Sequence, residues 1–402
     1  MHLAPTARQR ELRARLRARF RTLMPDGPPA SDDVAGQRAV LRRLGAEGLL
    51  GLGWPVEYGG QGRGADEQFV FFDEAYRAGA PVSMVTLNTV GPTLMKYGSE
   101  EQKAFFLPRI LSGDLVFAIG YSEPSAGTDL AALRTRAVRD GASGDWVVDG
   151  QKVFTSNAQN ADWIWLACRT DPDAPKHQGI SIILVPTDAP GFSWTPIETV
   201  GGLTTTATYY DGIRVPGSNL VGEEHGGWGL ITNQLNHERV ALAAIGMQAE
   251  DFYARVLAAA RTPDPVTGER RVDSTWVRSQ LAEVHARLAA TRLLNWRLVQ
   301  DVGAGRLAPG DASGVKFAGT ESAIETYRMC QRIAGDAGWV RAGSPGAFGG
   351  TGDGDDGGSA VGDGELERMN RAAQINTFGG GVSEVQREIV ATMRLGMKRG
   401  RR

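Results

Sequence analysis

The segment from Tyr121 to Asp129 gathers the residue types that hold anionic or flat ligands. It reads Tyr-Ser-Glu-Pro-Ser-Ala-Gly-Thr-Asp, so hydroxyls, small side chains and backbone N–H groups fall within one short stretch. Successive N–H groups in such a loop can cradle a phosphate or the polar edge of a flat cofactor. A polar turn between two strands has the same composition, so this segment alone leaves both interpretations open.

A second segment offers a complementary surface. Residues 150–157 read Gly-Gln-Lys-Val-Phe-Thr-Ser-Asn. Phe154 supplies an aromatic face, and Thr155 and Ser156 supply hydroxyls beside it. A flat cofactor can stack on the ring and form hydrogen bonds with the hydroxyls. Taken alone, this segment is also weak support for a binding site.

Other kinds of catalytic site lack their signatures in this sequence. The sequence contains no Gly-Lys pair of a P-loop, no Gly-x-Ser-x-Gly elbow and no His-Glu-x-x-His zinc motif. The five histidines are scattered without the spacing of metal ligands, so no metal site is expected. The net charge of −2 argues against a nucleic-acid partner, which needs a concentrated cationic surface.

The sequence also indicates where the protein works. Two cysteines, Cys168 and Cys330, cannot form a disulfide framework, which fits the reducing cytoplasm. No apolar run approaches the roughly 20 residues that span a membrane, and the N-terminus lacks the apolar core of a secretory signal. Residues 7–24 predict an amphipathic helix whose many arginines form a solvated face; a transit peptide or a nucleic-acid arm is the alternative interpretation.

The elements that would position these segments fall into three blocks, which predict an α+β fold. An N-terminal helical domain is expected over residues 1–117. Short β-rich runs predict a middle domain over residues 118–222, built as an antiparallel sandwich or barrel. Long helices over 228–257, 274–302, 315–334 and 384–395 predict a C-terminal helical domain, residues 223–402. Within it, residues 341–365 are rich in Gly and Asp and are expected to form a mobile loop.

Four motifs, taken together and in this order, resemble those of the acyl-CoA dehydrogenase family. Pro55-Val-Glu-Tyr-Gly-Gly60 resembles a turn in the family's N-terminal domain. The segments 121–129 and 150–156 resemble its two flavin-binding segments, the second of which usually ends Trp-Ile-Thr. Gly379-Gly-Gly-Val-Ser-Glu-Val-Gln-Arg387 resembles its closing Glu-Gly-Thr-Ser-x-Ile-Gln-Arg motif. The resemblance covers nearly the whole chain.

The resemblance implies a fold, a cofactor and a reaction. The fold is a helical domain, a β domain and a C-terminal four-helix bundle, and the cofactor is FAD. The reaction is α,β-dehydrogenation of an acyl-CoA thioester, with electron-transfer flavoprotein or a similar protein as the electron acceptor. By position, Tyr121, Ser122, Thr155 and Ser156 contact the flavin and Phe154 packs on it. Thr128 lies where the family has a serine near the CoA phosphates, so it is expected to touch cofactor and substrate.

The closing motif lacks the residue that many family members use as the catalytic base. Counting back from Arg387 places Gly380 where those members have the glutamate that removes the α-proton. Branched-chain and long-chain members carry the base elsewhere, at a position that matches Glu238 in Leu235-Asn-His-Glu-Arg239. The resemblance therefore implies Glu238 as the base and Arg239 as a substrate contact. An ordinary Glu-Arg pair on a helix surface is the alternative. The backbone N–H of Gly380 keeps the family's role of holding the thioester oxygen.

Several further stretches are similar to actinobacterial dehydrogenases that shorten steroid side chains, including residues 164–172, 175–180, 209–216 and 235–240. That similarity implies lipid or steroid catabolism of the β-oxidation type, with a homotetramer or an α2β2 heterotetramer as the assembly. The lack of a side chain at Gly380 leaves space that suits a bulky or branched acyl group.

Two departures from the family's flavin-binding motifs leave other functions as alternatives. The arginine that binds the flavin diphosphate of a neighbouring subunit normally lies in Arg-x-x-Phe-Gly. Arg278 is the nearest substitute here, and the Gln-x-Phe-Gly-Gly segment is replaced by Arg332-Ile-Ala-Gly-Asp336. A catalytically silent partner subunit is therefore one alternative, and a flavin oxidase or monooxygenase of the same fold is another.

Overall fold

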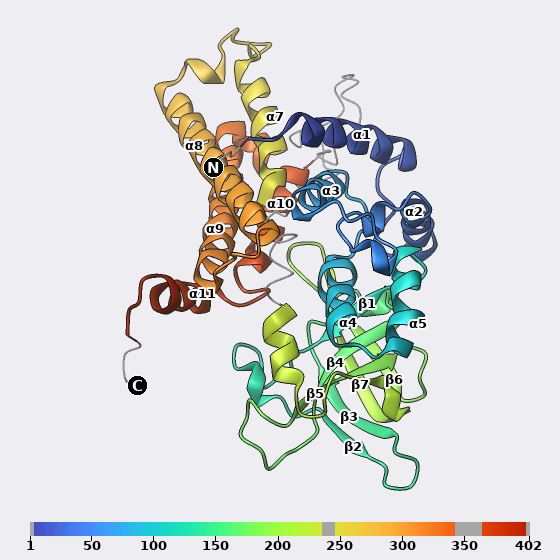
Figure 1. Cartoon of the computed structure of the whole chain (residues 1–402). Helices are drawn as coiled ribbons and strands as arrows, with labels where there is room; N and C mark the ends of the chain where they lie inside the picture. The colour runs from blue at the N-terminus through green and yellow to red at the C-terminus, as the bar shows by residue number, and fades with distance from the viewer. Residues whose placement is uncertain (1–3, 235–245, 342–363, 399–402) are drawn as a thin grey trace.

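The computed structural model describes residues 4–234, 246–341 and 364–398, and the chain runs from helices through one sheet and back to helices (Figure 1). This order confirms the predicted α+β class. The N-terminal helices are α1 (Ala7–Leu23), α2 (Val34–Ala46), α3 (Ala65–Arg77), α4 (Gly91–Tyr97) and α5 (Glu100–Leu111). No helix in the described ranges is both long and apolar enough to cross a membrane.

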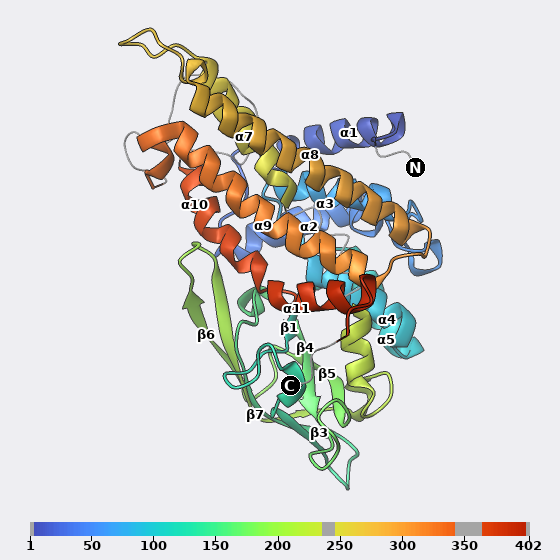
Figure 2. The same ribbon diagram turned by 90° about the vertical axis from the view of Figure 1, so that its left-hand side faces the viewer.

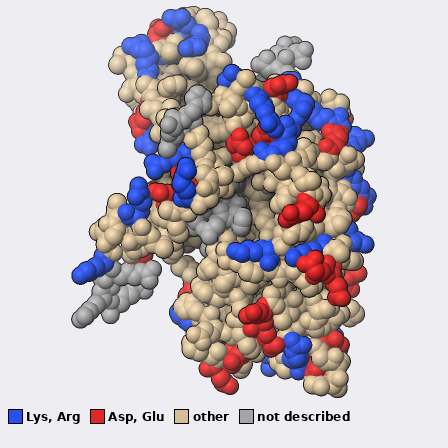
Figure 3. Space-filling model, viewed as in Figure 1, with Lys and Arg blue, Asp and Glu red and all other residues tan. Residues whose placement is uncertain are grey.

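Helix α1 confirms the predicted amphipathic helix, and its arginines do more than face solvent. Its apolar stripe is buried, and a capping box between Thr6 and Gln9 fixes its start. Arg13 contacts both Asp73 and Glu74 on α3 at 2.5 Å. Both carboxylates are almost fully buried, so part of the basic face neutralises acids inside the helical domain. On the face drawn in Figure 3, basic and acidic side chains are interspersed rather than gathered into one cationic surface.

The core of the N-terminal domain closes around Trp54, which is 2% exposed. Its indole N–H donates to the Leu87 carbonyl at 2.9 Å. The ring lies against the first residue of α4, Gly91, where a Cβ atom would stand 2.1 Å from the ring carbon Cζ2. Only glycine fits at this contact without moving the indole.

We therefore expect Gly91→Ala to destabilise the protein by about 1–3 kcal/mol, because overpacking a buried contact displaces its neighbours. Gly229→Ala is the matched control, since a Cβ at Gly229 meets nothing within 4 Å in a helical segment, and it should be neutral or stabilising. Urea unfolding curves measure both. Equal stabilities for the two variants would contradict the assigned contact.

The middle domain is one sheet whose central strands are buried on both faces. Its strands are β1 (Phe117–Gly120), β2 (Arg136–Arg139), β3 (Trp146–Lys152), β4 (Trp163–Arg169), β5 (Ile180–Pro186), β6 (Phe192–Glu198), β7 (Thr204–Val215) and β8 (Leu220–Val221). Alternate residues of β4 point to two different cores: Trp165 joins the N-terminal helices, and Ile164 joins the other side of the sheet. This double burial explains why β4 and β5 read as continuous apolar runs.

The prediction of a purely antiparallel sheet is wrong at β4. The strands follow the order β6-β7-β3-β2-β4-β5-β8, and β1 pairs with β4 in parallel over Phe117–Gly120. The β2 strand also meets β4 in parallel, at Arg136 and Arg169. The physical reason is connectivity: β1 enters the sheet directly from α5, and the intervening β2–β3 hairpin lets β4 return in the same direction.

The C-terminal helices are α7 (Ala249–Arg261), α8 (Thr275–Gly303), α9 (Pro309–Ala334), α10 (Glu365–Ala372) and α11 (Ser383–Ile389). Figure 2 shows α7, α8 and α9 running alongside one another above the sheet. Residues 227–234 are also helical. Most of the predicted mobile loop, residues 342–363, lies outside the described residues, and its last residue, Glu365, begins α10.

A buried arginine joins the two helical domains. Arg77 at the end of α3 contacts Asp73 on its own helix at 2.8 Å, and Glu250 and Asp251 on α7 at 2.8 and 2.5 Å. Burial opposes its charge, but the carboxylates of Asp73, Asp251 and Glu250 raise the pKa of the Arg77 guanidinium. The contact fixes α7 against α3, so the C-terminal helices have a defined position relative to the N-terminal ones.

Candidate active site

The loop that begins at Tyr121 is anchored by a buried ion pair. Lys152 Nζ lies 2.8 Å from Glu123 Oε1 and donates to the Tyr121 carbonyl at 3.1 Å. The backbone N–H groups of Arg134 and Thr135 donate to the two oxygens of Glu123, each at 2.7 Å. Although burial alone would raise the pKa of Glu123, the Lys152 ammonium and these hydrogen bonds lower it. Glu123 thus connects the loop that begins at Tyr121 with the backbone at residues 134–135 and with Lys152 on β3.

The second predicted segment lies directly beside this loop, because the Val153 N–H donates to the Ser122 carbonyl at 2.8 Å. Phe154 has φ of 59°, a left-handed conformation that is unfavourable for a side chain of this size, and the residue is 63% exposed. Such strain persists only where the surroundings impose it, and it gathers at ligand sites. The exposed ring is therefore a surface offered to a ligand.

Thr155, which is predicted to contact the cofactor, follows Phe154 and is bonded to the neighbouring strand β7. Its side chain is fully buried and bonds to Thr208 Oγ1 at 3.1 Å, while its backbone exchanges hydrogen bonds with Thr206. These bonds hold the segment against β7, beside the exposed Phe154. Ser156 is exposed next to it, with its hydroxyl 2.9 Å from that of Thr205.

Gln234 is a neighbour of this site that the sequence motifs did not reveal. It is 2% exposed, and its carbonyl oxygen accepts a hydrogen bond from the Tyr121 hydroxyl. Its Nε2 atom is buried and has no hydrogen-bond partner among the described residues. Since buried donors in folded proteins are almost always satisfied, this amide is poised for a bound group. No local pattern marks Gln234, because its contact with Tyr121 spans more than a hundred residues.

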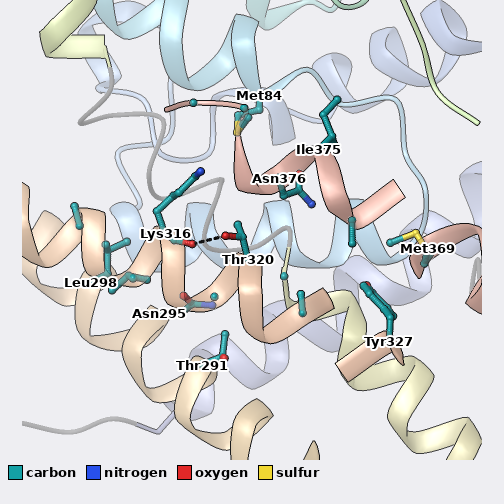
Figure 4. A pocket seen from close by; sticks show the side chains of 18 residues that line it. Met84, Thr291, Asn295, Leu298, Lys316, Thr320, Tyr327, Met369, Ile375 and Asn376 are labelled. Carbon is teal, nitrogen blue, oxygen red and sulfur yellow. Dashed lines mark hydrogen bonds between the residues drawn. The ribbon is translucent and has the colours of Figure 1, made fainter. Parts of the chain in front are cut away.

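A cavity of about 240 Å³ lies among the C-terminal helices, against Met84 (Figure 4). One face of α9 forms much of its wall, at a helical spacing of four, three, four and four residues: Ala312, Lys316, Gly319, Ala323 and Tyr327. Most of these side chains are small, so the face is hollow. Other labelled residues of the wall are Thr320 of α9, Thr291, Asn295 and Leu298 of α8, and Met369, Ile375 and Asn376 of residues 365–377.

Gly380 lies in the wall of this cavity, in the turn that precedes α11. Its φ is 66° and that of Gly381 is 97°, so the turn uses the left-handed conformations that glycine adopts readily. Among the described residues, the Gly380 N–H has no hydrogen-bond acceptor. A donor without a partner at a cavity wall is available to a ligand oxygen.

The remaining predicted site residues lie apart from these groups or outside the described structure. Thr128 is exposed on the first loop. Arg278 is on the first turn of α8, where it donates to the Asp273 carbonyl at 2.7 Å. Figure 1 shows that end of α8 far from the sheet, so Arg278 does not meet the Phe154 segment of its own chain. Glu238 and Arg239 fall outside the described residues.

This arrangement defines a protein that can hold a flat cofactor on its sheet and an apolar ligand among its helices. Comparison with known families agrees: the N-terminal, middle and C-terminal domains described for acyl-CoA dehydrogenases match residues 6–114, 118–211 and 225–395. The chain belongs to the acyl-CoA dehydrogenase family.

Individual members of the family and solved structures are similar to the chain along nearly its full length. Acyl-CoA dehydrogenase FadE26 of Mycobacterium tuberculosis is 49% identical, with 100% of both chains covered. FadE29 of the same organism is 46% identical, with 99% of each covered. A solved structure described as the Tcur3481-Tcur3483 steroid ACAD has a TM-score of 0.90 at 53% identity, with full coverage of both chains. The ChsE4-ChsE5 complex from M. tuberculosis has a TM-score of 0.88 at 48% identity, with the same coverage.

The residues present fit FAD, the cofactor of the family. The strained, exposed Phe154 ring and the neighbouring Ser156 hydroxyl match what a flat ring system needs. Beside Tyr121, the buried Gln234 Nε2 is a donor without a partner in the described part of the chain.

Phe154→Gly separates the cofactor role of the ring from its structural cost. Glycine relieves a left-handed strain of about 1–2 kcal/mol and adds chain entropy of about 0.5–1 kcal/mol. Little burial is lost because the ring is exposed. We expect the FAD-free chain to unfold at a slightly higher temperature and FAD affinity to fall by ~0.5–1.5 kcal/mol. Thermal unfolding and FAD titration measure the two effects, with Phe154→Trp as the control that keeps stacking. Unchanged FAD affinity in the glycine variant would refute the stacking role.

Proposed function

We propose that the chain is an FAD-dependent acyl-CoA dehydrogenase whose acyl group is bulky, branched or part of a steroid side chain. The observation that carries the proposal is the cavity with Gly380 in its wall, where the backbone offers an N–H and the residue itself has no side chain. The relatives named as dehydrogenases, similar along the full chain, favour this activity over a silent subunit or an oxidase.

We assign separate roles in the dehydrogenation to residues of this chain. The α-proton of a thioester is weakly acidic, so it needs a base and a donor to the thioester oxygen. We assign the base to Glu238, which takes the proton, and the donor to the Gly380 N–H. As the Cα–Cβ double bond forms, the β-hydrogen leaves as hydride, and bound FAD supplies the two-electron acceptor for it. Tyr121, Ser122, Phe154 and Ser156 hold and orient the ring system. Thr128 and Arg239 are proposed to contact the CoA thioester.

The assembly and the surroundings are part of the proposal. The related ChsE4-ChsE5 structure is described as a complex, and the Tcur3481-Tcur3483 structure carries two protein names. We propose that this chain also forms an α2β2 tetramer, or a homotetramer, in which Arg278 reaches the cofactor of a neighbouring subunit. Electron-transfer flavoprotein or a similar protein is the proposed acceptor, and the cytoplasm is the proposed location, where the buried thiols of Cys168 and Cys330 stay reduced.

A panel of acyl-CoA thioesters tests the proposal. The purified chain, alone and co-expressed with a homologous partner, is mixed anaerobically with straight-chain, branched and ring-bearing acyl-CoAs. We expect the yellow flavin absorbance to be lost with the branched and ring-bearing thioesters, and kcat/KM to be higher for them than for short straight chains. A preference for short straight chains would refute the acyl-group assignment. A colourless protein in every combination would refute the dehydrogenase assignment for this chain.

A further inference from the structure

The turn that carries Gly380 is tied down through its carbonyl oxygens by side chains from two helices. Lys316 on α9 donates from Nζ to the Gly381 carbonyl at 2.6 Å and to the Thr377 carbonyl at 3.4 Å. Gln386 on α11 donates from Nε2 to the Gly380 carbonyl at 3.2 Å. The bonded carbonyls therefore lie on both sides of the peptide unit that joins Gly379 to Gly380.

These ties matter because the turn has little conformational preference of its own. Gly379, Gly380 and Gly381 follow one another, and glycine has the widest backbone freedom of any residue. Ordering each residue costs about 1–2 kcal/mol of backbone entropy, which nothing within a glycine run offsets. The Gly380 N–H lies in the planar peptide unit that joins Gly379 to Gly380. Fixing the carbonyls of Thr377, Gly380 and Gly381 on either side of this unit limits how it can rotate.

Lys316 is an unusual residue for this place. It is 8% exposed, among the small residues of the α9 face that lines the cavity (Figure 4). Lysine is rarely buried unless its ammonium is well bound. A hydrogen bond from a charged donor is about twice as strong as a neutral one, so an ammonium holds a backbone carbonyl more firmly than an amide or hydroxyl does.

We propose that Lys316 is a positioning residue for the reaction: it holds the 377–381 turn so that the Gly380 N–H points at the thioester oxygen. This inference rests on the proposed function, because it assigns the N–H its role in dehydrogenation. Lys316 acts through the turn and takes no proton from the substrate.

The first test separates positioning from binding. Lys316→Met keeps the length of the side chain and removes the donor, and Lys398→Met, an exposed lysine near the C-terminus, is the matched control. Both are compared with the unaltered FAD-loaded enzyme, with its partner chain if one is needed. A displaced catalytic group can cost on the order of 100-fold in rate. We expect kcat and the rate of α-proton exchange into D2O to fall by about that factor in Lys316→Met. KM should change little, and the control should match the unaltered enzyme. A raised KM with unchanged kcat would mean that Lys316 binds the substrate and would overturn the proposal.

The second test does not depend on the reaction. Amide hydrogen exchange at residues 378–382, measured by mass spectrometry on the same holoenzymes, should be at least about tenfold faster in Lys316→Met than in the control, because the turn loses its anchor. If no acyl-CoA reacts with any of the enzymes, the proposed function fails, and this measurement still decides whether Lys316 orders the turn. Unchanged exchange would overturn the positioning role even in an active enzyme.

A conservative variant guards against a general folding defect. Lys316→Arg retains a charged donor and should recover part of the lost kcat and of the exchange protection. If Lys316→Met yields little folded protein, Lys316→Gln, which is shorter and neutral, takes its place with the same expected direction. Failure of arginine to recover either quantity while the protein folds normally would argue that charge at this position is not what holds the turn.

Discussion

Glu238→Gln is expected to lower kcat for acyl-CoA dehydrogenation by a factor of about 10²–10⁴, the usual contribution of a positioned general base. Glutamine has nearly the shape of glutamate but cannot accept the α-proton. Substrate binding should persist, so the variant is expected to bind the preferred acyl-CoA without losing its yellow colour. Stopped-flow absorbance under anaerobic conditions measures the rate.

The control for this experiment makes the same chemical change at an exposed position. Glu283→Gln on α8 removes a carboxylate that pairs with Arg287 at the protein surface, and it should leave kcat unchanged. If Glu238→Gln reacts as fast as the control, the base lies elsewhere. The vacancy at Gly380 would then mean that another residue, in this chain or its partner, takes the proton.

Glu123→Gln is expected to lower the free energy of unfolding by about 3–5 kcal/mol, more than Gly91→Ala does. The reason is that the substitution leaves Lys152 buried without its counter-charge. The Lys152 side chain is 0% exposed and that of Glu123 is 5% exposed, so water does not screen the pair. The loop from Tyr121 would lose its anchor as well, so FAD should dissociate more readily. Urea unfolding and FAD release measure the two effects.

The surface variant Glu283→Gln again provides the contrast, since an exposed pair spaced four residues apart on a helix contributes only about 0.3–0.5 kcal/mol. The pH dependence gives an independent check. The pKa of Glu123 in the folded chain lies below its ordinary value of 4.5, so the ionised carboxylate stabilises the fold above that pH. As the pH falls below 4.5 and through the lowered pKa, this stabilisation is lost. The stability difference between the unaltered chain and Glu123→Gln should therefore shrink in acid. A constant difference would contradict the assignment.

Local sequence patterns predicted those parts of the fold and the site whose signals lie in neighbouring residues. The apolar stripe of α1 and the two loops on the sheet could both be read from residue spacing and turn residues. The pairing of β1 with β4 could not, because the direction of a strand depends on how the chain connects the two domains. Alternation along a strand also does not reveal which hydroxyl another strand will cover, as β7 covers that of Thr155.

The cavity shows a different limit. Its signal was present in the sequence, since Ala312, Gly319 and Ala323 recur at helical spacing and leave one face of α9 without bulk. What the spacing cannot show is the partner across the gap. Lys316 meets the carbonyl of Gly381 65 residues further along the chain. Gln234 meets Tyr121 across 113 residues. Such contacts arise only when the domains pack, so they become visible only in the folded structure.

The ion pairs of Arg77 limit which segments can be recombined between related enzymes. Its carboxylate partners lie on both sides of the sheet domain in the sequence, Asp73 before it and Glu250 and Asp251 after it. A chimaera that takes its first hundred residues from one relative and its last helices from another would separate a buried cation from its anions unless both parents share this set. The two helical ends of the chain thus pack as one unit, although the sheet lies between them in the sequence. Successful recombination should therefore retain Arg77 together with Glu250 and Asp251.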